Sequence, residues 1–116
     1  MNAHLFESFS KMIDKLPAGE VIPAAERECQ LLENDLVTNR PVPKQEAHSI
    51  LSFCRFLTVT KAGLKVPRTV LPPGHAAFYQ KILERLIEVG ELPESAHEQY
   101  DEAFTVPLLK SAADVY

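Results

Sequence analysis

Nine prolines divide this chain of 116 residues into segments whose apolar residues recur at helical spacing. Apolar residues three and four positions apart form one face of an α-helix, whereas a half-buried strand would show alternation. Proline lacks a backbone donor and restricts the residue before it, so these prolines are expected to lie between helices. The pattern predicts an all-α fold, a compact single-domain bundle of five or six short helices over residues 1–116.

Residues 75–89 show the clearest helical pattern, with Phe78, Ile82 and Leu86 on one face and Gly90 at the end. Another helix is expected to begin just after Pro23, because a proline usually stands at a helix boundary. The predicted helices cover residues 2–16, 24–39, 43–60, 75–89 and 91–104, with a short sixth helix over 105–112.

Residues 61–74 contain three of the nine prolines and cannot be helical throughout. We expect one long proline-rich connector here, extended across the domain surface and held to the core by its apolar residues. A short hairpin over residues 56–71, turning at Ala62 and Gly63, is the alternative.

The chain is long enough for one hydrophobic core, because 46% of its residues are hydrophobic. Its uncharged runs are far shorter than the ~20 residues that a membrane-spanning helix needs. Residues 1–13 lack the layout of a secretory signal, so a cytoplasmic location without membrane association is expected. Cys29 and Cys54 lie on apolar faces of predicted helices, which favours buried free thiols over a disulfide.

Charge is distributed unevenly along the chain. Residues 47–83 contain no Asp or Glu, and the net charges of residues 1–39, 40–83 and 84–116 are -4, +6 and -6. Four cations fall within residues 55–68, and the next predicted helix begins at a histidine with free backbone amides. Such a cluster can bind an anion or an acidic protein partner. The candidate binding residues are Arg55, Lys61, Lys65, Arg68 and His75.

The sequence favours a non-enzymatic protein-binding, adaptor or regulatory protein that contacts an acidic protein surface through this basic patch. The apolar stripes are wide, and residual apolar surface would support self-association, for instance as a homodimer. The simpler interpretation of the cations is that they are solvated or pair with the protein's own acids. The side chains that look exposed are Phe53, Phe56, Tyr79 and Leu109, and the simpler alternative is a well-filled core that buries them.

Three other functions are weaker alternatives. A small nucleic-acid-associated regulator is disfavoured because four cations are few and the two acidic ends would repel phosphates. An inhibitor or immunity-type protein has the same sequence properties as an adaptor. A metal-dependent helical enzyme is favoured least, because Glu94 and His97 form a single Glu-x-x-His and di-metal bundles use two. Without a G-x-S-x-G elbow or a glycine-rich phosphate loop, no catalytic residue, metal or cofactor is expected.

Overall fold

Five helices and a two-stranded parallel bridge make up the computed structural model, which describes residues 5–63 and 68–105. The helices are α1 (Leu5–Lys15), α2 (Ala18–Val37), α3 (Lys44–Lys61), α4 (Pro73–Glu88) and α5 (Ala96–Ala103). The strands are β1 (Thr69–Val70) and β2 (Phe104–Thr105), which pair residue for residue in this order. The prediction of a small all-α globule is confirmed. Within the described residues, no helix is both long and apolar enough to cross a membrane.

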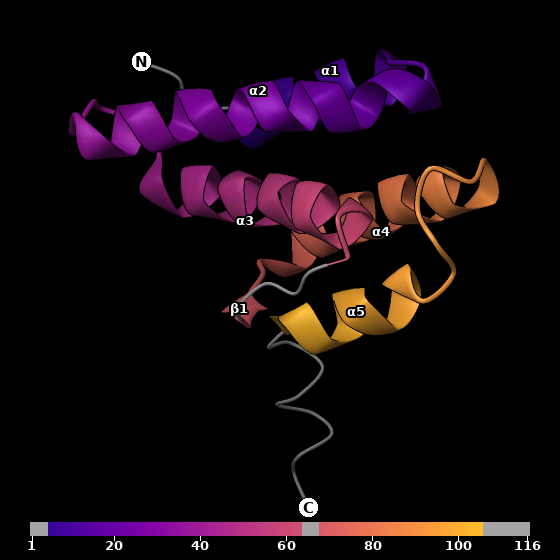
Figure 1. Cartoon of the computed structure of the whole chain (residues 1–116). Helices are drawn as coiled ribbons and strands as arrows, with labels where there is room; N and C mark the ends of the chain where they lie inside the picture. Colours follow the sequence, from indigo (N-terminus) through magenta and orange to yellow (C-terminus); the bar gives the residue numbers. More distant parts are fainter. Residues whose placement is uncertain (1–4, 64–67, 106–116) are drawn as a thin grey trace, which may run out of the picture.

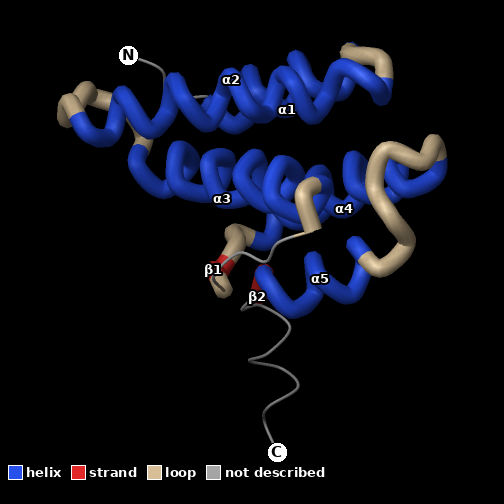
Figure 2. Tube along the Cα trace, in the orientation of Figure 1, coloured by secondary structure: helices blue, strands red, loops and turns tan. Residues whose placement is uncertain are grey.

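The helices lie in layers, as Figures 1 and 2 show. α2 packs on α3, α1 contacts α3 and α4, and α5 lies on the other side of α3 and α4 together with the strands. α3 is the central element because it contacts α1, α2 and α5. Nine of its 18 residues are buried, including Ile50, Phe53 and Leu57, so its apolar surface is wider than the single stripe of a surface helix.

α2 begins at Ala18 and contains Pro23, so the prediction that it begins after this proline is wrong. A proline removes the hydrogen bond to the carbonyl four residues earlier, here that of Gly19. Pro23 lies in the second turn of α2, close to the amino-terminal end, where the first N–H groups have no partner within the helix. The helix therefore loses few hydrogen bonds to this proline. The neighbouring Val21 and Ile22 are buried, and their burial holds the first turns of α2 against the core.

α3 continues as a helix to Lys61, so the alternative hairpin over residues 56–71 is wrong. Gly63 follows the helix with a φ of +83°, a left-handed conformation that glycine adopts without strain. The expected interval between helices is present, but part of it forms β1, and α4 begins at Pro73, two residues earlier than predicted. The early start is favourable because proline suits the first position of a helix.

α5 begins at Ala96, five residues later than predicted. The chain first wraps around the end of α4, where the carbonyl of Leu86 accepts hydrogen bonds from the N–H groups of Glu91 and Leu92. Leu92 is buried in this turn. Thr105, the expected cap of the sixth helix, belongs to β2, and the helix predicted after it lies outside the described residues.

Three of the four side chains expected at the surface are part of the core. Phe53, Phe56 and Tyr79 are 1% exposed or less, whereas Leu109 lies outside the described residues. The expectation fails because α3 has neighbours on several sides, which the periodicity of a single helix does not reveal. Exposed large apolar side chains occur elsewhere, at Met12, Leu31, Val37, Val70 and Val89.

Candidate functional site

Three polar side chains join α3 to α4 inside the molecule. Ser49, in the second turn of α3, is 4% exposed. Its Oγ atom lies 2.8 Å from Nδ1 of His75 and 2.8 Å from Oη of Tyr79, and these two residues are one turn apart on α4. A hydroxyl donates one hydrogen bond and accepts others, so Ser49 can satisfy both neighbours. The three groups form a polar network within an apolar core.

Aromatic packing holds the His75 ring in place. The ring of Phe6, on α1, stacks on His75 with the ring centroids 3.8 Å apart and the planes 9° from parallel. The backbone N–H of Phe6 donates to Oε1 of Glu46 at 2.8 Å, which fixes α1 against the start of α3. Burial lowers the pKa of His75, and the nearby Glu46 carboxylate offsets only part of this effect. The imidazole is therefore mainly neutral at pH 7.

Tyr79 is the most deeply buried member of the network. Its ring stacks on Phe53 with the centroids 4.1 Å apart. Burial raises the pKa of Tyr79, and this effect outweighs the opposing hydrogen bond from Ser49. The phenol consequently stays protonated. Donation from Tyr79 to Ser49 and from Ser49 to the neutral His75 then satisfies all three groups.

A cleft of about 440 Å³ opens beside this network, between the start of α3 and β1. Its apolar part includes Leu71, which is fully buried, and Val70, which is 63% exposed. Gln45 and His48 add polar groups from α3. We name it the α3–β1 cleft, and its lining residues are Gln45, His48, Ser49, Thr69, Val70, Leu71 and Pro72.

Two helices begin at the α3–β1 cleft. Gln45 lies in the first turn of α3, and Pro72 immediately precedes α4. The capping residues of the two helices, Pro43 and Pro72, make no side-chain hydrogen bond to the first-turn N–H groups. The amino-terminal end of a helix carries a partial positive charge. Together with the exposed Arg68, which adjoins β1, these helix ends favour a negatively charged group in the cleft.

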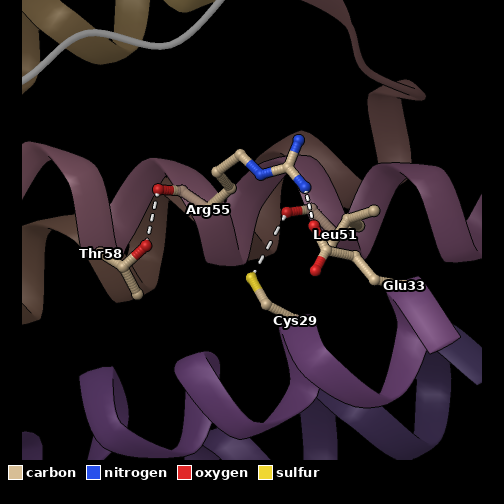
Figure 3. A network of polar contacts seen from close by, with 5 residues as sticks. All are labelled: Cys29, Glu33, Leu51, Arg55 and Thr58. Carbon is tan, nitrogen blue, oxygen red and sulfur yellow. Dashed lines mark hydrogen bonds and ion pairs between the residues drawn. The ribbon is translucent and has the colours of Figure 1, made fainter.

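Two of the predicted binding residues pair with acids of the same chain. The Arg55 guanidinium forms an ion pair with Glu33 of α2, which Figure 3 shows. Nζ of Lys61 lies 3.2 Å from Oε1 of Glu91, after α4. Arg55 and Lys61 are six residues apart on α3, which places them about 120° apart around the helix. Lys65 lies outside the described residues.

The other two predicted residues, Arg68 and His75, do not line the α3–β1 cleft, but each adjoins a residue that does. Arg68 directly precedes β1, and the His75 ring contacts the Ser49 hydroxyl that lines the cleft. Sequence reasoning misses Ser49 as a site residue. One signal in the sequence could have identified it. Ser49 lies beside Ile50 on a helix that buries most of its apolar residues, and a buried hydroxyl needs a hydrogen-bond partner.

Comparisons of the chain with protein-family models, curated proteins and solved structures found no match. Among residues 5–63 and 68–105, no three or more His, Cys, Asp and Glu side chains gather where they could hold a metal ion. The functional argument therefore depends on the geometry of the cleft and of the polar network.

The contact between Ser49 and His75 has the distance of a nucleophile and its general base. Two features favour a structural role instead. Ser49 is almost fully buried within a regular helix, and its hydroxyl also bonds to Tyr79. Attack on a substrate would break that second bond and would require an exposed hydroxyl. We interpret the network as the support of the cleft wall, which holds α3 and α4 together.

Proposed function

We propose that this protein is a non-enzymatic protein-binding domain that takes an extended, acidic segment of a partner protein into the α3–β1 cleft. The observation that carries the proposal is the combination of an apolar lining with the amino-terminal ends of two helices at one cleft. The proposal keeps the acidic protein partner expected from the sequence. It moves the contact surface from residues 55–68 to the cleft and to Arg68 beside it.

The strand β1 supports an extended conformation for the bound segment. In the described part of the chain, β1 pairs only with β2 (Figure 2), and Phe104 of β2 is not among the residues that line the cleft. A strand with one unpaired edge can accept a further strand through its backbone groups, and neighbouring pockets then select the side chains. The exposed Val70 provides an apolar contact at this edge.

The electrostatics of the cleft support an acidic segment. Each helix end favours a nearby carboxylate by about 0.3–1 kcal/mol. His48 lines the cleft from α3, and Arg68 adjoins it from β1. Arg55 and Lys61 contribute less to binding in this proposal, because neither of them lines or adjoins the cleft.

The experiment is a titration of the isotope-labelled protein with two peptides, followed by amide chemical shifts. An amidated octapeptide that alternates Glu and Val should shift the amides of Gln45, His48 and Val70 at millimolar concentration. An octapeptide that alternates Lys and Val tests the charge preference. Equal effects of the two peptides, or an absence of shifts at the cleft, would contradict the proposal.

A matched pair of variants locates the binding surface. Val70→Ser removes the apolar contact at the cleft, whereas Val37→Ser removes an exposed valine at the end of α2. We expect the first variant to weaken binding of the Glu–Val peptide several-fold and the second to leave it unchanged. Equal weakening by both variants would indicate non-specific apolar binding.

A further inference from the structure

Two cysteines face each other across the contact between α2 and α3. The thiol of Cys29, on α2, lies 4.0 Å from the backbone oxygen of Leu51, on α3. Leu51 is one helical turn before Cys54, so the two α3 residues share a face. The Cys29 and Cys54 side chains are close enough for each to affect the pKa of the other.

Solvent reaches only one of the two thiols. Cys54 is 0% exposed, whereas Cys29 is half-buried. Cys29 also lines a surface pocket of about 350 Å³. The other residues that line this pocket are Glu26, Arg27, Gln30 and Thr58. A small oxidant can therefore reach Cys29 from the pocket but has no comparable route to Cys54.

The charges around Cys29 favour its thiolate, as Figure 3 shows for part of the surroundings. The hydrogen bond from Cys54 lowers the pKa of Cys29 most strongly, and the Arg55 guanidinium lowers it further. Burial and the carboxylates of Glu33 and Glu26 oppose these effects without cancelling them. Burial raises the pKa of Cys54, so that residue stays a thiol.

We propose that Cys29 and Cys54 are a peroxide-reactive pair in which Cys29 is oxidised first and Cys54 then forms a disulfide with it. The Cys29 thiolate attacks one oxygen of a hydroperoxide, the O–O bond breaks, and a sulfenic acid and water are produced. The Cys54 thiol then gives its proton to the hydroxyl group of the sulfenic acid as its sulfur attacks the Cys29 sulfur, so the S–O bond breaks and a second water leaves. The two thiols together lose two electrons and two protons, and hydrogen peroxide is reduced to two waters.

The disulfide would link α2 covalently to α3, the central helix of the fold. It forms at a different place from the α3–β1 cleft, because no residue of the Cys29 pocket lines that cleft. The inference is therefore independent of the proposed peptide binding.

The test exposes the whole chain to a few equivalents of hydrogen peroxide, blocks the remaining thiols under denaturing conditions and measures intact mass and peptide mass. We expect loss of two hydrogen masses and one peptide pair joined through Cys29 and Cys54 within a single chain. In the Cys54→Ser variant, oxidation should stop at a sulfenic acid on Cys29 that dimedone traps. In the Cys29→Ser variant, Cys54 should react at least tenfold more slowly than Cys29 does in the original chain.

A second pair of variants separates the chemistry from any effect on folding. Arg55→Gln should slow alkylation of Cys29 by iodoacetamide several-fold at neutral pH, because it removes a cation beside the thiolate. Arg27→Gln changes a cation that lines the same pocket and should have a smaller effect. Disulfides formed only between chains, no dimedone adduct in Cys54→Ser, or rapid oxidation of Cys54 in Cys29→Ser would each overturn the proposal.

Discussion

Replacing Ser49 with alanine should destabilise the protein far more than the loss of one small side chain suggests. The change removes both hydrogen bonds of the polar network, at 2.8 Å to His75 and 2.8 Å to Tyr79. The Tyr79 hydroxyl is in a fully buried residue and would lose its partner, which costs about 1–3 kcal/mol. His75 is half-buried, so solvent compensates part of its loss. We expect a total of about 2–4 kcal/mol, with the lower end reached if water enters from the cleft.

A double-mutant cycle of Ser49 and Tyr79 measures their interaction free energy directly. Tyr79→Phe keeps the ring that stacks on Phe53 and should cost about 0.5–1.5 kcal/mol, because Ser49 can still donate to His75. In the Tyr79→Phe variant, Ser49→Ala no longer leaves a buried phenol hydroxyl without a hydrogen-bond partner. The double variant should therefore be more stable than the sum of the single effects predicts, by about 1 kcal/mol or more.

The assay is urea unfolding followed by far-ultraviolet circular dichroism. Ser52→Ala serves as the control, because Ser52 lies on the same helix but forms no side-chain hydrogen bond within the described residues. It should be neutral or slightly stabilising, since alanine has the higher helix propensity. Strictly additive effects of Ser49→Ala and Tyr79→Phe, or equal effects of Ser49→Ala and Ser52→Ala, would refute the argument that the network holds α3 against α4.

Two further predictions concern protonation and backbone conformation. Because burial lowers the pKa of His75, the unfolded chain takes up a proton first as the pH falls, and stability should drop from about pH 6.5 downward. Urea unfolding between pH 7 and pH 5 should show a smaller drop in stability for His75→Gln than for the original chain. Gly63→Ala should cost about 1–2 kcal/mol because the residue has a φ of +83°. Gly74→Ala, in the first turn of α4 with open space around it, should be neutral or stabilising in the same unfolding assay, and equal effects would contradict this argument.

The helices could be predicted from sequence because their apolar residues repeat with the helical period. In α4, Ile82 and Leu86 are buried as their spacing requires. The same reasoning fails at Pro23. A proline usually marks a helix boundary, but here the burial of Val21 and Ile22 keeps the residues before the proline in the helix. It also fails for Phe53 and Phe56, whose exposure depends on how many helices surround α3. Periodicity describes one helix at a time and does not give the number of its neighbours.

The basic cluster illustrates the corresponding limit for sites. Arg55 and Lys61 are neighbours in sequence, yet their partners Glu33 and Glu91 lie 22 and 30 residues away along the chain. No local pattern predicts such pairs. The α3–β1 cleft has the same origin, because Ser49 meets residues after position 68 only through the folding of the whole chain. His75 could be singled out from sequence, because the start of a helix is a local feature that favours anions, but the cleft itself was not predicted.

The uneven charge of the sequence is accounted for largely within the fold itself. The cationic middle of the chain supplies partners to acids from both ends, so the three blocks of opposite sign are complementary after folding. Such exposed pairs contribute only about 0–1 kcal/mol each, so they favour this packing without determining it. Once they are formed, the cations on α3 and α4 attract outside acids less strongly. The pairs that link the blocks are Arg40 with Asp35, Arg55 with Glu33, Lys81 with Asp14 and Lys61 with Glu91.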